Sequence, residues 1–277
     1  MIRYSVIVPY RGCPELLQRA LASVPSREDV EVLPIEDADG RGAGWARNIG
    51  LGKAQGEWLV FLDSDDFFTA EAFDLLDAHA KDGADLVCFN VQAVMSDNGM
   101  PSARQADKQR LLGAYASRPA ELAFYCRYCY PEPWGKMVRR DFVRREGIRF
   151  DETVCANDYM FSVLCGLKAR EVAYDQRVMY VVTEREGSVS RQYFDSPRKL
   201  QDRLSVYWRV QQLFDGAGVP LQPFYGLWML CRKEGGDSAG QARAFCRAQG
   251  ISRWQLWKGC AIRVIRKRLR IGVPNNA

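Results

Sequence analysis

Three carboxylates lie within four positions at the end of an apolar run, in the stretch WLVFLDSDDFF (residues 58–68). Asp63, Asp65 and Asp66 follow five apolar residues that have the length of a buried strand. Two carboxylates about 4 Å apart repel by roughly 4 kcal/mol at an effective dielectric near 20. The cluster therefore needs bulk water or a hard divalent cation, which takes one or two carboxylates together with substrate phosphates. The alternative is that the acids favour the N-terminus of a following helix capped by Thr69.

Histidine and cysteine chemistry finds little support in this sequence. His79 is the single histidine and lies inside a helical pattern, which argues against a Ser-His-Asp or Cys-His mechanism. Among the nine cysteines only Cys126 and Cys129 are close together, and a structural zinc site would normally need a second such pair. We therefore expect buried, reduced thiols in a cytosolic protein, and a chemistry that uses mainly carboxylates.

Two glycine-based phosphate motifs are incomplete. After the glycines of residues 40–44, Trp45 and Arg47 occupy the positions where a dinucleotide fingerprint needs its third glycine. The Gly-Lys pair at 52–53 is followed by Ala54, where a P-loop requires Ser or Thr. The sequence therefore argues against both of these nucleotide motifs.

Strand and helix patterns alternate through the first hundred residues. The expected strands are 4–10, 30–37, 58–62 and 84–94, and the expected helices are 14–24, 44–56 and 69–83. This order predicts an α/β fold with a Rossmann-like, mostly parallel sheet flanked by helices. Ligands bind beyond the carboxyl ends of the strands in such sheets, and acidic clusters follow two of the first three strands. Pro34 places the second strand near an edge.

The second half of the chain is more helical. Residues 101–120 hold no clear period and predict a loop. The expected elements beyond it are helices at 139–146, 159–169 and 198–218 and a strand or strand pair at 171–183. We expect residues 196–277 to form a helical C-terminal extension. No apolar run approaches 18 residues, so no spanning helix is expected, and the N-terminus is typical of a first strand rather than a signal peptide.

The excess positive charge is confined to the C-terminus. The formal net charge is +5, and residues 253–277 hold seven Lys or Arg and no acid. One side of a helix over this segment would present Trp254, Trp257, Ala261, Val264, Ile265 and Leu269. The pattern favours an anionic membrane surface as partner of residues 253–271, with a docked helix as the alternative. No recognition motif supports nucleic acid. We therefore expect a cytoplasmic protein, peripheral on the inner face of the cytoplasmic membrane.

Two long stretches of the chain resemble the family 2 glycosyltransferases, which are inverting, nucleotide-sugar-dependent enzymes of the GT-A fold. Residues 42–68 contain an Ala-Arg-Asn helix and an apolar strand that closes on Asp-x-Asp-Asp, with the spacing of that family. Residues 131–163 are similar to its second conserved block, in which a Trp-x-Lys helix leads to Arg-Phe-Asp-Glu and an acidic pair. The resemblance implies that residues 1–195 form the nucleotide-sugar-binding catalytic domain.

On the donor side, the resemblance implies a nucleotide site. Its expected residues are Pro9, Tyr10, Arg11, Arg47 and Asp63. Either Asp37 or Asp39 would receive the uracil N–H; the alternative for this acidic stretch is a solvated Asx turn. For Arg47 and Asn48 the alternatives are a structural role and an exposed helical face.

Around the transferred sugar, the resemblance assigns Asp65 to Mn²⁺ or Mg²⁺ on the donor diphosphate. Asp66 would bind the sugar or cap the next helix. A bound ion would neutralise the charge that develops on the departing nucleoside diphosphate.

On the acceptor side, Asp158 is the expected catalytic base for the acceptor hydroxyl, or else only a helix N-cap. Asn157 stands where the family has the first acid of its pair, and Asp151 and Glu152 are further candidates for the base. Trp134 and Lys136 would frame the acceptor pocket, although Trp134 could equally be core. Arg185 and Ser188 match a late family segment near the diphosphate.

The resemblance predicts a metal-dependent hexosyl- or N-acetylhexosaminyltransferase of cell-surface polysaccharide synthesis. Its donor would be a UDP-sugar and its acceptor a saccharide or lipid-linked saccharide. The alternatives are a sugar nucleotidyltransferase, which should carry a glycine-rich N-terminal loop, and a non-catalytic binding protein of the same fold.

Overall fold

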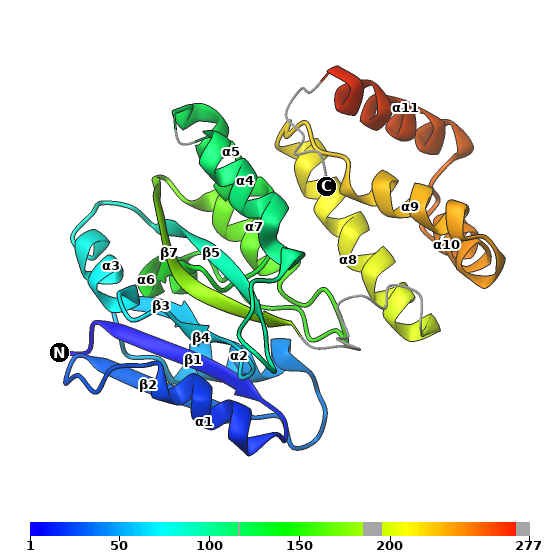
Figure 1. Cartoon of the computed structure of the whole chain (residues 1–277). Helices are drawn as coiled ribbons and strands as arrows, with labels where there is room; N and C mark the ends of the chain where they lie inside the picture. The colour runs from blue at the N-terminus through cyan, green and yellow to red at the C-terminus, as the bar shows by residue number, and fades with distance from the viewer. Residues whose placement is uncertain (116, 185–195, 270–277) are drawn as a thin grey trace. The chain divides into compact units, whose positions relative to one another are not determined.

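The computed structural model describes residues 1–115, 117–184 and 196–269 (Figure 1). The chain forms two compact units: residues 1–152 with 157–188, and residues 153–156 with 189–277. The expected domain boundary at residue 195 lies outside the described residues.

A seven-stranded sheet forms the centre of the first unit, in the order β2-β1-β3-β6-β5-β7-β4. The strands are β1 (Tyr4–Tyr10), β2 (Val30–Glu36), β3 (Trp58–Phe61), β4 (Phe67–Phe68), β5 (Leu86–Met95), β6 (Lys136–Arg139) and β7 (Val172–Glu184). The pairings give five strands one direction, with β4 and β6 opposed to them. The predicted α/β class with a mostly parallel, helix-flanked sheet is confirmed. The second predicted strand, β2, lies at an edge as Pro34 indicated.

Helices surround this sheet (Figure 1). They are α1 (Pro14–Ala22), α2 (Ala43–Lys53), α3 (Ala72–His79), α4 (Ala106–Tyr115), α5 (Pro119–Tyr128), α6 (Arg140–Arg145) and α7 (Tyr159–Lys168), with a short 3₁₀ turn at Ala103–Gln105. The predicted loop at 101–120 was wrong, because α4 and the start of α5 occupy most of it. Lys108 on the inner side of α4 is 8% exposed and pairs with Glu132 at 2.7 Å, so a charged residue interrupts the apolar period.

Two further local predictions were wrong. The Trp-x-Lys segment is not a helix: Lys136 begins β6, which pairs antiparallel with both β3 and β5. Thr69 does not cap α3, whose N-cap is Glu71; the Thr69 hydroxyl donates instead to the carbonyl of Val178, at 3.0 Å. Both differences arise from partners in distant parts of the chain: β3 and β5 pair with the segment that begins at Lys136, and β7 supplies the partner of Thr69.

The second unit consists of helices that pack on one another. They are α8 (Pro197–Gly216), α9 (Pro223–Glu234), α10 (Gly236–Ala248) and α11 (Arg253–Leu269). Its core residues include Leu200, Leu204, Phe224, Trp228 and Phe245. The amphipathic register predicted for residues 198–218 thus supplies α8 with its buried face.

Candidate active site

The acidic loop after β3 is held by residues of β7. The Tyr180 hydroxyl donates to Asp66 Oδ2 at 2.9 Å and accepts from the Asp63 amide at 3.0 Å. The amide of Thr183 donates to Asp66 Oδ1 at 2.7 Å. Asp66 is 4% exposed, and burial, reinforced by the charges of Asp65 and Asp63, raises its pKa well above the ordinary value. Asp66 therefore anchors the loop, and it does not cap α3.

Asp63 and Asp65 keep partly exposed side chains in the same loop. The Thr183 hydroxyl donates to the Asp65 carbonyl at 2.6 Å, and the Arg19 guanidinium donates to the same oxygen. These bonds fix the backbone of Asp65, a residue that is partly exposed. Sequence analysis did not identify Arg19, on α1, or Thr183. Both residues bond to a backbone carbonyl oxygen, and such a contact has no sequence motif.

The Ala-Arg-Asn element joins the two conserved blocks. Arg47 is 4% exposed and donates to Asp63 Oδ1 at 2.6 Å and to Asn157 Oδ1 at 3.0 Å. The Asn48 amide bonds both to the N–H of Phe150, at 2.9 Å, and to its carbonyl, at 3.0 Å. Both side chains are buried, so the exposed-face alternative is wrong.

Close packing brings α2 against the second block. A Cβ built on Gly44 would lie 1.9 Å from the carbonyl oxygen of Asp151, so only glycine allows this approach. The glycine at this position thus serves helix packing, consistent with the absence of a phosphate motif around it.

Asp158 occupies the N-cap position of α7, but its side chain makes no capping hydrogen bond. Burial raises the pKa of its carboxyl to about 6; the positive charge of Arg47 opposes this rise, and the negative charges of Glu132 and Asp63 add to it. These charges show that Asp158 lies within electrostatic range of the acidic loop. Of the alternatives, the side-chain capping role is wrong, and a carboxylate with a pKa near neutrality is suited to accept a proton.

Asp37 lies beside the end of β1 and closes the loop that contains the glycines of residues 40–44. Its amide donates to the Tyr10 carbonyl at 2.9 Å, and its carboxylate accepts from the amides of Arg41, at 2.6 Å, and Gly42, at 2.8 Å. Asp37 is 5% exposed, so a solvated turn does not describe it, whereas Asp39 is exposed.

The remaining nucleotide candidates lie at the carboxyl end of β1 or just beyond it. Pro9 is buried within the strand, Tyr10 is partly exposed, and Arg11 is exposed with its guanidinium over Gly40. β1 pairs in parallel with β3, so its carboxyl end lies at the same edge of the sheet as that of β3.

Trp134 and Lys136 lie in the interior rather than on an open pocket wall. The Trp134 ring stacks on Tyr180 at 5.1 Å between centroids, and Lys136, 2% exposed, donates to the Tyr130 carbonyl. Both would influence an acceptor only through the groups that cover them. Arg185 and Ser188 lie outside the described residues.

The Lys108–Glu132 pair is a further missed feature near the site. Lys108 Nζ lies 4.5 Å from the centroid of Trp134, and the Trp134 ring also stacks on Tyr180, the residue that holds the acidic loop. The carboxylate of Glu132 is partly exposed, at 25%, and acts electrostatically on Asp158. The pair could not be found from the sequence, because the resemblance assigns no role to Glu132 and Lys108 lies in the segment predicted to be a loop.

The carboxylates of the acidic loop suit a metal ion that is bound partly by the substrate, rather than one that is bound by protein ligands alone. Within residues 1–115, 117–184 and 196–269, no group of three or more His, Cys, Asp or Glu residues is arranged to hold an ion. Asp63 and Asp65 offer partly exposed oxygens in one loop, and Mg²⁺-like ions bind one or two carboxylates plus phosphate oxygens and water. The donor set therefore fits an ion that arrives with a diphosphate.

Tyr180→Phe is expected to lower the free energy of unfolding by about 1–3 kcal/mol, because the buried Asp66 loses a hydrogen bond. The matched control is Tyr174→Phe: the Tyr174 hydroxyl is buried without a hydrogen-bond partner, so its removal should be neutral or slightly stabilising. Chemical denaturation of the two variants measures the difference. Equal losses in both would contradict the role given to Tyr180.

Comparison with known proteins gives three kinds of match. Residues 32–155 match the family model described as Glycosyl transferase family 2. A cholesterol galactosyltransferase of Borreliella burgdorferi is 27% identical over 52% of this chain and 42% of its own length. The succinoglycan biosynthesis protein ExoO of Rhizobium meliloti is 29% identical over 54% of this chain and 44% of its own length. The chain thus spans less than half the length of these relatives.

Among solved structures, Staphylococcus aureus TarS residues 1–349 in complex with UDP-GlcNAc is similar in fold. Its TM-score is 0.55 at 19% sequence identity, covering 74% of this chain and 66% of that one. The likeness confirms the predicted GT-A architecture.

Proposed function

We propose that the chain is an inverting family 2 glycosyltransferase that moves a sugar from a nucleotide diphosphate sugar to an acceptor hydroxyl, and the match of residues 32–155 to that family's model supports this. One observation carries this proposal: buried Arg47 bonds to Asp63 on the donor side and to Asn157 beside Asp158. Arg47 thus links the carboxylate that we assign to the donor with the residue that precedes the proposed base.

The reaction uses Asp158 as the base. The acceptor oxygen attacks the anomeric carbon from the face opposite the diphosphate, and its proton passes to the Asp158 carboxylate. The bond from the anomeric carbon to the diphosphate oxygen breaks, and the nucleoside diphosphate leaves with the electron pair. Arg47 holds Asp63 and the start of α7 in fixed positions while this occurs.

The donor side is formed by the ends of β1, β2 and β3. Tyr10 and Arg11, with Asp37 or Asp39, would contact the base and ribose, and Asp63 would hold the ribose or act beside the metal ion. Asp65 would hold Mn²⁺ or Mg²⁺, which supplies charge neutralisation to the leaving diphosphate. Asp66 acts on the sugar only indirectly, since its two oxygens accept bonds from Tyr180 and Thr183.

The substrates are a UDP-hexose or UDP-N-acetylhexosamine and a saccharide or lipid-linked acceptor of cell-surface polysaccharide synthesis. The UDP-GlcNAc complex of TarS and the succinoglycan role named for ExoO support this choice. The nine free cysteines are consistent with the reducing cytoplasmic side, and a lipid-linked acceptor would require work at a membrane surface.

Release of UDP from a panel of UDP-sugars, with Mn²⁺ and with EDTA, tests the function. We expect release with Mn²⁺ that EDTA suppresses and that an acceptor saccharide accelerates. A sugar nucleotidyltransferase would instead release pyrophosphate from UTP and a sugar phosphate. A non-catalytic binding protein would release neither, and either result would refute the proposal.

A further inference from the structure

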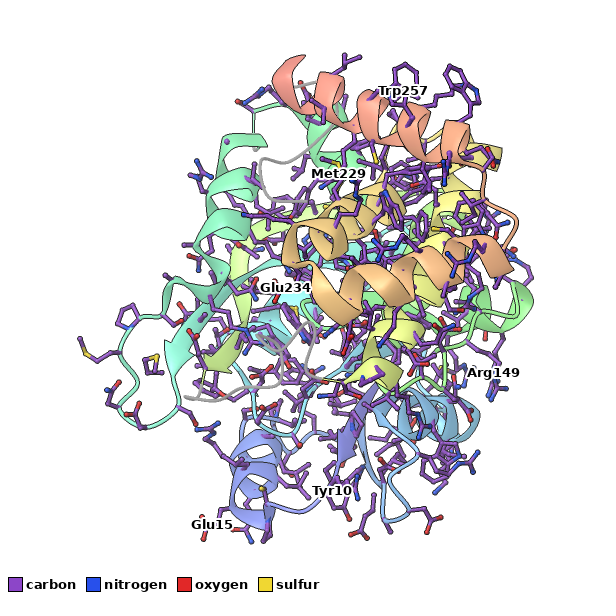
Figure 2. All side chains as sticks on the ribbon, turned by 90° about the vertical axis from the view of Figure 1, so that its right-hand side faces the viewer. Tyr10, Glu15, Arg149, Met229, Glu234 and Trp257 are labelled. Atoms are coloured by element: carbon purple, nitrogen blue, oxygen red, sulfur yellow. The ribbon has the colours of Figure 1, made fainter. Side chains whose placement is uncertain are left out.

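An apolar surface of α11 is exposed to solvent. Trp254 is 65% exposed, Trp257 63%, Ile265 54% and Val264 36%, and the two indole rings stack at 4.9 Å. Figure 2 shows Trp257 on the outer side of its helix. We call these four residues the Trp face.

The face that α11 uses for packing is a different one. A Cβ on Gly259 would lie 2.4 Å from the Tyr225 ring of α9, and Arg263 Nη1 donates to the Gln222 carbonyl at 3.2 Å. Leu256 and Cys260 also pack on the core of this unit. The docked-helix alternative therefore accounts for one side of α11 and leaves the Trp face unexplained.

The apolar surface continues onto α9. Met229 and Leu230 are 38% and 41% exposed, and they line a groove of about 420 Å³ with Val264, Arg263 and Lys233. Figure 2 labels Met229 on α9 and Trp257 on α11. Val264 thus belongs both to the Trp face and to the lining of the groove, and it joins the exposed apolar residues of α11 to those of α9.

Cations surround this surface. Arg253 and Lys258 are exposed on α11, and Lys233 is exposed beside the groove. The sequence from residue 253 to the end has seven Lys or Arg and no acid. Within the described residues, no helix is both long and apolar enough to cross a bilayer.

We propose that the Trp face, with Met229 and Leu230, is a docking surface for a bilayer that contains anionic lipids. Paired tryptophans favour the boundary between headgroups and acyl chains, and cations beside them favour negative headgroups. A second copy of the chain would place like charges against each other, and nucleic acid would leave the apolar side chains unpartnered. The inference does not depend on catalysis.

Flotation of the full chain with vesicles tests the surface. The vesicles are phosphatidylcholine alone or phosphatidylcholine with phosphatidylglycerol. We expect binding to the anionic vesicles only, weakened by added salt. Trp254→Ala/Trp257→Ala should weaken it by on the order of tenfold, whereas Met100→Ala, at an exposed apolar residue of the other unit, should not. Arg253→Gln and Lys258→Gln should each cost about fivefold, against no change for exposed Arg170→Gln.

Several outcomes would overturn the proposal. They are equal binding to neutral vesicles, no binding to either kind, or wild-type binding by the double tryptophan variant. A dimer that the tryptophan substitutions convert to a monomer would assign the surface to a second copy. Tighter binding to duplex DNA than to anionic vesicles would assign it to nucleic acid. Thermal melts of each variant verify that the fold is retained.

Discussion

Asparagine in place of Asp158 is expected to lower kcat/KM by about 10²–10⁴-fold, the usual range for loss of a general base. The amide keeps the size of the side chain but cannot accept the proton of the acceptor hydroxyl. UDP release in the presence of acceptor measures the effect. The matched control is Asp141→Asn, whose side chain is 83% exposed on α6 and should retain full activity.

Stability separates this catalytic role from a structural one. The Asp158 side chain makes no capping bond, so Asp158→Asn should not destabilise α7. The folded-state pKa of about 6 lies above that of an unfolded aspartate, so this group stabilises the fold at low pH and loses that contribution as pH rises through 6. At pH 8 the variant should therefore be as stable as the wild type or slightly more so. A marked loss of stability would favour the structural role.

The pH dependence of the wild type gives an independent measure. Asp158 must be ionised to act as a base, so kcat/KM should fall as pH drops through about 6. Glu132→Gln removes a negative charge that raises this pKa and should move the fall to lower pH. An acid limb near pH 4 in the wild type would contradict the assignment.

The first three strands were predictable because each is a compact apolar run followed by turn residues. The expected ranges 4–10, 30–37 and 58–62 match β1, β2 and β3 to within one residue at each end. Their carboxyl ends could also be assigned from the sequence, since parallel strands bring those ends to one edge. That edge is where Asp37 and Asp63 are found.

Two of the missed elements, β6 and α4, bury charged side chains. β6 begins with Lys136 and ends with Arg139, and the buried ammonium of Lys136 is satisfied by the Tyr130 carbonyl. α4 buries Lys108 against Glu132. Hydrophobic periodicity assigns charged residues to the solvent-facing side of an element. An element that buries charged residues against partners from distant parts of the chain therefore has no local sequence signal.

The division of roles within the acidic loop also needed the structure. Asp63, Asp65 and Asp66 are alike in sequence, and their partners come from α1, α2 and β7. Tyr180 and Thr183 lie more than a hundred residues further along the chain. Only their hydrogen bonds show that Asp66 is buried and structural while its neighbours stay partly open.

Replacing Asp65 with asparagine is expected to lower turnover by on the order of 10³-fold, because an ion at the diphosphate contributes several kcal/mol of charge stabilisation. It should also remove the increase in UDP affinity that Mn²⁺ produces in the wild type, measured by calorimetry with and without the ion. Asp97→Asn, at an exposed position of the first unit, is the control and should leave both quantities unchanged.

Substitution of the neighbouring Asp66 provides a comparison for this experiment, because the variants at Asp65 and Asp66 should lose different properties. Asp66→Ala leaves the Thr183 amide and the Tyr180 hydroxyl without their acceptor, so the free energy of unfolding should fall by about 1–3 kcal/mol. Asp65→Asn keeps the backbone carbonyl that accepts from Thr183 and Arg19, so these bonds of the loop should survive the substitution. If Asp65→Asn keeps Mn²⁺-dependent UDP affinity and turnover, the metal role proposed for this loop is wrong, whatever happens at Asp66.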